Sequence, residues 1–98
     1  MFDKFNEKEY INILKHIKQR KEIDKVYDLS DKNFMYIHNL KSPWWKLKID
    51  FKEECGTKFS FEFTRRDMLF YFETYAAFKV YFNQIMEMTP GFLTDFIK

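Results

Sequence analysis

The chain is poor in the residues that cross-link or interrupt a fold. Its 98 residues include one cysteine, two glycines and two prolines. A lone cysteine excludes a disulfide within the chain, and the sequence contains no internal repeat, linker or low-complexity run. This length is enough for one hydrophobic core, so residues 1–98 are expected to form a single domain.

Long apolar runs and strong net charge are also missing. Charged and amide side chains interrupt the most apolar segment at Glu73, Lys79, Asn83 and Gln84. No membrane span is therefore expected. The first residues are charged rather than apolar, which predicts no signal peptide and a cytoplasmic location. The formal charge of +2 is too small to require nucleic acid. Residues 1–52 nevertheless carry 12 basic and 8 acidic side chains, against 5 and 7 in residues 53–98.

Side chains that carry metal or covalent chemistry are few and scattered. His16, His38 and Cys55 fall on an expected helix, strand and loop, without the close spacing of a metal site. Cys55 lies beside Glu53 and Glu54, and two adjacent negative charges disfavour a reactive thiolate. The two glutamates are neighbours on a strand end, so they point apart and do not form an acid/base pair. No metal, cofactor or enzymatic activity is expected.

Aromatic side chains, in contrast, are abundant. The chain holds 13 phenylalanines, 6 tyrosines and 2 tryptophans, and most of them follow Phe34. One core of this size needs fewer rings, and aromatic residues dominate protein-binding hot spots, so the surplus suggests a surface that another molecule covers. Phe, Tyr, Ile, Lys and Asn make up 46 residues, and AT-rich codons encode these types. A low-GC bacterium or its phage is the indicated source.

The N-terminal segment predicts a helix that begins at Glu7 and ends near residues 20–24. Asn6 is the expected N-cap with Glu9 as its capping-box partner, and Phe5 and Tyr10 are spaced as a hydrophobic staple. One face carries apolar residues at helical spacing: Tyr10, Ile13, Leu14 and Ile17. Residues 25–29 fit either a short strand or the last turn of this helix.

A β-hairpin follows, in which residues 45–52 and 57–64 alternate between apolar and polar side chains. A loop at Glu54-Cys55-Gly56, with the glycine in the left-handed region, sets a single register. That register places three apolar pairs on one face: Phe51 beside Phe59, Ile49 beside Phe61, and Leu47 beside Phe63. On the other face it places Lys48 beside Glu62 and Asp50 beside Ser60, so both faces agree.

The strand that begins at Phe34 extends this sheet. A short loop at Lys41-Ser42-Pro43 would place Met35 and Ile37 on the apolar face and Tyr36, His38 and Trp44 on the open face. Lysines interleaved with rings are typical of single-stranded nucleic-acid binding, and they are equally typical of a solvated outer face. The candidate nucleic-acid residues are Tyr36, His38, Lys46, Lys48, Lys52, Lys58, Arg65 and Arg66.

The C-terminal third predicts a long helix from Thr64 to about Met88. Thr64 and Asp67 form a capping-box pattern, with Phe63 and Met68 as a staple. Apolar residues nearly encircle this helix, so it needs cover on more than the sheet side. The candidate partner surface, which is either a homodimer seam or a contact for another protein, is Tyr71, Tyr75, Phe78, Tyr81, Phe82 and Trp44. Thr89-Pro90 ends the helix, and a short final helix follows with Phe92, Leu93, Phe96 and Ile97.

Arg65 and Arg66 open the long helix, where cations oppose the helix dipole. They are either tolerated beside Asp67 or kept to bind an anion. The order helix, three strands, helix is similar in outline to the double-stranded-RNA-binding domain. That family opens its second helix with a glycine-containing, lysine-rich motif, whereas residues 64–67 have no glycine and only two cations. The resemblance therefore carries over only Arg65 and Arg66, as phosphate contacts.

Together these patterns predict an α+β fold. We expect an antiparallel meander of three or four strands, with the N-terminal helix and the long C-terminal helix on one face. As a class, such a small aromatic-rich chain resembles the phage and mobile-element accessory proteins that inhibit a host protein or ribonucleoprotein by direct binding, anti-CRISPR proteins among them. The alternative is an RNA-binding module that uses the lysine face.

Overall fold

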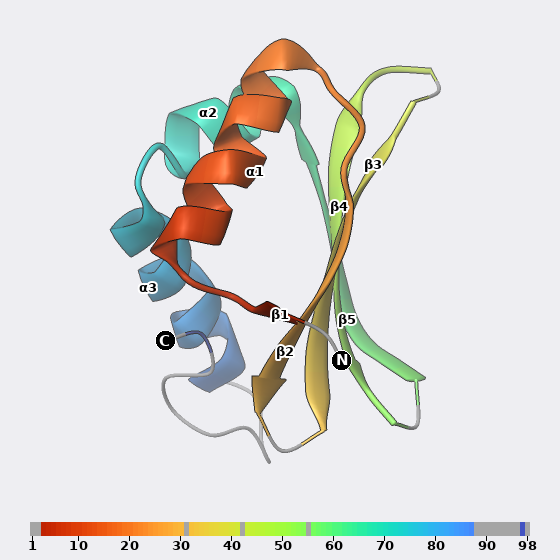
Figure 1. Ribbon diagram of the computed structural model, residues 1–98, viewed down its shortest axis with the longest axis vertical. Helices are drawn as coiled ribbons and strands as arrows, with labels where there is room; N and C mark the ends of the chain where they lie inside the picture. Colours follow the sequence, from red (N-terminus) through yellow and green to blue (C-terminus); the bar gives the residue numbers. More distant parts are fainter. Residues whose placement is uncertain (1–2, 31, 42, 55, 88–96, 98) are drawn as a thin grey trace.

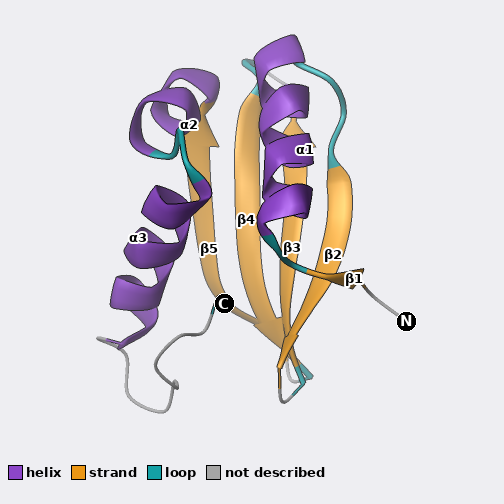
Figure 2. Cartoon of the chain, turned by 60° about the vertical axis from the view of Figure 1, so that its left-hand side comes forward, coloured by secondary structure: helices purple, strands orange, loops and turns teal. Residues whose placement is uncertain are grey.

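The computed structural model describes residues 3–30, 32–41, 43–54, 56–87 and 97. Its elements are listed here in chain order: β1 (Asp3–Lys4), α1 (Glu7–Gln19), β2 (Asp24–Ser30), β3 (Asn33–Leu40), β4 (Lys46–Glu53), β5 (Gly56–Thr64), α2 (Arg65–Tyr71) and α3 (Tyr75–Glu87). The strands form one five-stranded sheet in the order β1-β2-β3-β4-β5. All three helices lie on the same face of the sheet (Figures 1 and 2). The predicted α+β class with helices on one face is confirmed.

The sheet is mixed rather than purely antiparallel. Strands β2 to β5 form the expected antiparallel meander, and β1 adds to β2 in parallel through two residue pairs. The prediction of three or four strands is therefore wrong, because it omits the strand β1. Two polar residues carry no periodicity, so nothing in the sequence marks Asp3–Lys4 as a strand. The open question over residues 25–29 is settled, since they lie within β2.

Helix α1 begins and ends close to the predicted positions. The backbone N–H of Glu9 donates to Asn6 Oδ1 over 3.0 Å, which confirms the N-cap. Phe5 and Tyr10 pack edge to face with their ring centroids 6.2 Å apart, as the staple predicts. The helix ends at Gln19 and is capped by Arg20, whose φ of 53° lies in the left-handed region that glycine usually occupies.

The hairpin register is confirmed at all five residue pairs that the sequence predicts for β4 and β5. Nearer the turn the pairing shifts by one residue, since Lys52 pairs with Thr57 and Glu53 with Gly56. The extra residue is Lys58, and it forms a bulge that tightens the expected three-residue loop. Gly56 has a φ of 123°, which other residues rarely adopt. Met35 and Ile37 are fully buried on the helix-covered face, as expected.

The prediction of one long helix is wrong, because residues 72–74 interrupt it and leave two helices, α2 and α3. Its start is correct, since Thr64 and Asp67 form the reciprocal capping box. After Tyr71 the backbone leaves helical geometry, and Thr74 then caps α3 by accepting from the N–H of Ala77 over 3.1 Å. Figure 2 shows the two helices running in different directions.

Burial of Phe72 explains this break. Its side chain is only 2% exposed and contacts Phe63, Phe78 and Phe82. Its backbone carbonyl has left the helical ladder and accepts a hydrogen bond from the buried hydroxyl of Tyr10. Burial raises the pKa of that hydroxyl, so the phenol stays protonated and able to donate.

The core lies between the sheet and the three helices and is rich in rings. The side chains that are at most 2% exposed come from every layer: Tyr10, Ile13, Ile17, Tyr27, Met35, Ile37, Leu47, Ile49, Phe51, Met68, Phe72, Phe78, Phe82, Met86 and Ile97. Asn83 binds the backbone of Ile97 at two points, accepting its N–H over 2.6 Å and donating to its carbonyl over 2.7 Å. The expected final helix lies otherwise outside the described residues.

Candidate binding surfaces

The open face of the sheet carries the predicted ring and lysine side chains. Tyr36 pairs across the strands with Asp50, and His38 pairs with Lys48. The rings of Tyr36 and His38 stack 4.0 Å apart at an angle of 10°, and Lys52 Nζ lies 5.3 Å from the centre of the Tyr36 ring. The prediction that Tyr36, His38, Lys48 and Lys52 share one face is therefore confirmed, whereas Trp44 lies before β4 and outside the sheet.

Carboxylates interleave with the lysines on this face. Asp24 lies opposite His38, and Glu62 lies opposite Lys48. Asp28 forms an ion pair with Lys4 over 2.9 Å. The open face is thus a mosaic of both signs rather than a basic stripe, which disfavours electrostatic attraction to a phosphate backbone.

Asp50 is at the centre of this mosaic and is only 7% exposed. It accepts hydrogen bonds from His38 Nε2 over 3.0 Å and from the Ser60 hydroxyl. Burial raises the pKa of Asp50, but the two hydrogen bonds and the nearby Lys48 charge outweigh it, so the pKa is below its ordinary value. Sequence reasoning paired Asp50 with Ser60 and missed His38, which is its diagonal neighbour on β3.

A serine, a histidine and an aspartate in contact invite comparison with a catalytic triad. In a triad the imidazole stands between the hydroxyl and the carboxylate, so that it can take the hydroxyl proton. Here Asp50 stands between Ser60 and His38, and the Ser60 hydroxyl donates directly to the carboxylate. Nothing in this arrangement activates Ser60 as a nucleophile, so the network is structural.

The two arginines at the start of α2 have different surroundings. Arg65 reaches back to α1, where its Nε donates to the carbonyl of Ile17 over 2.9 Å and its Nη2 to that of Lys18 over 2.8 Å. Figure 1 shows α2 beside the C-terminal turns of α1. Arg65 therefore caps the negative end of the α1 dipole, and this explains a cation in the first turn of α2. Arg66 is exposed.

The predicted partner surface divides into buried and exposed rings. Phe78 and Phe82 are fully buried, so in this fold they cannot contact a partner and the prediction is wrong for them. Tyr75 is half-buried and packs on Phe5 with ring centroids 5.7 Å apart. Helical periodicity could not distinguish the buried rings from the exposed ones, because the interruption between α2 and α3 determines which rings face the sheet.

The remaining rings stay exposed at the junction of α2 and α3. Phe70 is 76% exposed, Tyr71 is 61% and Tyr81 is 40%. Phe70 and Tyr71 are in edge contact at 5.0 Å, and Tyr81 lies 6.4 Å from Phe63 of β5. We call Phe63, Phe70, Tyr71 and Tyr81 the aromatic corner. Trp44 is 74% exposed and lies before β4, outside the corner.

A hollow of about 330 Å³ opens within the aromatic corner. It is lined by Glu62, Phe63, Asp67, Tyr71, Phe72 and Tyr81. Its walls are therefore aromatic rings, and its two charged lining residues are both acidic. Such a hollow suits an apolar or cationic side chain of another molecule.

A scan against protein-family models and searches of curated proteins and of solved structures find no match to this chain. Its function must therefore be argued from the chemistry of its own surfaces.

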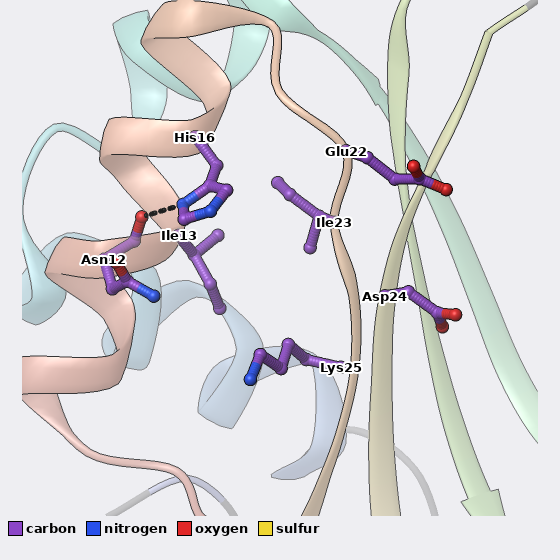
Figure 3. Close-up of a pocket in the computed structure, with 7 residues that line it drawn as sticks. All are labelled: Asn12, Ile13, His16, Glu22, Ile23, Asp24 and Lys25. Carbon is purple, nitrogen blue, oxygen red and sulfur yellow. Dashed lines mark hydrogen bonds between the residues drawn. The ribbon is translucent and has the colours of Figure 1, made fainter.

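A second, smaller hollow of about 40 Å³ lies between α1 and β2 (Figure 3). His16 stands at its wall and donates from Nδ1 to the carbonyl of Asn12 over 2.7 Å. In Figure 3 the carboxylates of Glu22 and Asp24 point away from His16. This space is too small for a cofactor, and its polar groups do not converge on a ligand.

Among the described residues, no group of three or more His, Cys, Asp or Glu side chains could hold a metal ion. None of the helices within the described ranges is long and apolar enough to cross a bilayer. Cys55 lies outside the described residues, so the reading of its thiol as unreactive stays a prediction.

Proposed function

We propose that this chain is a non-enzymatic binding protein that blocks a host protein or ribonucleoprotein by direct contact. Its small size and a composition typical of AT-rich codons favour the phage and mobile-element accessory proteins, the class that includes anti-CRISPR proteins. The observation that carries the proposal is the aromatic corner, where three large rings are exposed beside a hollow with acidic residues in its wall.

The exposed rings contribute little to the stability of the free protein. Phe70, at 76% exposed, gains little from folding, because most of its apolar surface stays in water. The same ring in an interface buries a large area, and aromatic anchors of this kind supply much of the binding energy of protein complexes. Glu62 and Asp67 add a preference for a partner with basic side chains near the contact.

The test is capture of partners by tagged protein from lysate of the source host, with and without nuclease treatment. We expect a protein partner that survives nuclease and is lost in the variant Phe70→Ser/Tyr71→Ser. The matched control is Ile11→Ser, which removes an apolar side chain of 48% exposure on α1 and should retain the partner. Equal capture by all three proteins would refute the role of the aromatic corner.

RNA binding is the second candidate, and one observation favours it. The stacked rings of Tyr36 and His38, with Lys52 above Tyr36, offer a platform on which a base could stack. Binding of fluorescent single-stranded RNA would then weaken steeply with salt and would fail in Lys46→Glu/Lys48→Glu. The interleaved carboxylates and the engagement of Arg65 with α1 make this the weaker candidate.

A further inference from the structure

The hollow of the aromatic corner forms where the interruption between α2 and α3 meets β5 (Figure 2). Phe72 is only 2% exposed and lies at its base. The rings of Tyr71, Tyr81 and Phe63 are inclined to the Phe72 ring by 54°, 62° and 87° respectively. The ring surfaces of the hollow therefore meet at steep angles, and an occupant packs against several rings at once.

Two carboxylates border this ring surface. Asp67 and Tyr71 are four positions apart on α2, so they lie on the same side of the helix. Asp67 Oδ2 accepts the backbone N–H of Thr64 over 3.2 Å, and this capping bond holds the carboxylate in place. An ionised carboxylate has about four acceptor positions, so Asp67 keeps the capacity for further donors. Glu62 adds a second carboxylate from β5, and its side chain is exposed.

Among the described residues, no lysine or arginine forms an ion pair with either carboxylate. The ion pairs of these cations involve other acids of the chain. Arg65, two positions before Asp67, donates to carbonyls of α1 instead. A cation that enters the hollow would therefore displace no ion pair of Glu62 or Asp67, whereas a ligand of Asp50 would have to displace His38.

We propose that the hollow binds an arginine side chain in a basic segment of the partner protein. This inference rests on the proposed function, and it names the chemical group that the aromatic corner recognises. A guanidinium is flat and stacks on aromatic rings, while its several N–H donors bind carboxylates at the same time. Charge complementarity with Glu62 and Asp67 selects this occupant.

Other occupants suit these walls less well. An apolar side chain would remove water from Glu62 and Asp67 without neutralising them, which is unfavourable. A lysine ammonium is more strongly hydrated than a guanidinium and has no planar face to stack on a ring. Both carboxylates repel a phosphate backbone, so a nucleic acid is not the occupant. With a volume of about 330 Å³, the hollow is at the small end of ligand pockets, a size that suits one side chain.

Titration of the whole chain with three capped tripeptides, followed by nuclear magnetic resonance, tests the proposal. Each peptide has glycine at both ends, and its middle residue is arginine, lysine or citrulline, which has the shape of arginine without the charge. We expect the arginine peptide to shift the amide signals of Phe63, Tyr71 and Tyr81. We expect it to bind about tenfold more tightly than the citrulline peptide, with the lysine peptide between the two.

Two double substitutions separate the charges of the hollow from the net charge of the protein. Glu62→Gln/Asp67→Asn removes both carboxylates, and the asparagine keeps an oxygen that can accept the N–H of Thr64. This variant should bind the arginine and citrulline peptides equally. The matched control is Glu73→Gln/Glu87→Gln, which removes two exposed carboxylates outside the lining of the hollow and should bind as the unaltered protein does.

Equal binding of the arginine peptide and either other peptide, or no shift at the aromatic corner, would overturn the proposal. Shifts of the same amides with protein concentration alone would also overturn it, because a second copy would then cover the hollow. Circular dichroism shows whether the variants fold, and if they do not, the three peptides on the unaltered protein decide.

Partner capture from lysate distinguishes this proposal from the proposed function. If Phe70→Ser/Tyr71→Ser loses the partner while Glu62→Gln/Asp67→Asn keeps it, the proposed function stands and the arginine proposal is refuted. If no partner is captured although peptide binding depends on the two carboxylates, the proposed function fails and the arginine site stands.

Discussion

Replacing Tyr10 with phenylalanine tests the account of the break between α2 and α3. The ring would keep its contacts, including Phe78 at 4.7 Å between centroids, and only the hydroxyl would be lost. The Phe72 carbonyl would then be buried without this donor, which costs about 1–3 kcal/mol. For a domain of this size, about 2 kcal/mol lowers the melting temperature by about 10 °C.

Urea unfolding followed by circular dichroism measures this difference directly. The control is Tyr71→Phe, which removes a hydroxyl from a side chain that is 61% exposed and should change the free energy of unfolding by less than about 0.5 kcal/mol. If Tyr10→Phe proved as stable as this control, the hydrogen bond to Phe72 would not be what stabilises the break. Burial of the Phe72 ring alone would then have to explain it.

Three further predictions concern other charges and pH. Arg65→Ala should lower the free energy of unfolding by about 1–2 kcal/mol because two carbonyls of α1 lose their donor, whereas Arg66→Ala should be neutral in the same urea titration. The lowered pKa of Asp50 stabilises the fold above the ordinary aspartate pKa, so stability should fall as pH drops through the folded value, and Asp50→Asn should flatten that acid limb. Burial raises the pKa values of Tyr10 and Tyr27, and the charge of Glu9 raises that of Tyr27 further. The two neutral phenols therefore contribute fully to folding stability below the unfolded tyrosine pKa of about 10, and this stability should be lost as pH rises above it. Thermal melts in alkaline buffers measure this loss.

The hairpin could be predicted from sequence because two independent patterns give the same register. Apolar side chains pair on one face of β4 and β5, while Lys48 and Glu62 pair on the other, and a slip by one residue would lose both matches. The caps at Asn6 and Thr64 were predictable for a related reason, since each depends on residues within one helical turn.

What could not be predicted depends on contacts between distant residues. Apolar spacing continues from Tyr71 to Phe82, so periodicity alone gives one helix, and the break needs a donor from Tyr10 for the Phe72 carbonyl. Thr74 was the available local signal, because threonine is a common N-cap. Arg65 likewise looks free in its own helix, and its acceptors lie 47 and 48 positions earlier in the chain.

The two candidate surfaces differ in whether their side chains already have partners within the chain. On the open sheet face, Asp50 already has His38 and Ser60 as partners within the chain, so a ligand of Asp50 would have to displace them. At the aromatic corner, Phe70 and Tyr71 are more than half exposed, and their contact with each other leaves most of their area in water. Polar residues at these two positions should cost the free protein almost no stability. A surface that folding does not require and that association would bury is best explained by binding, so loss of partner capture without loss of stability in Phe70→Ser/Tyr71→Ser is its expected signature.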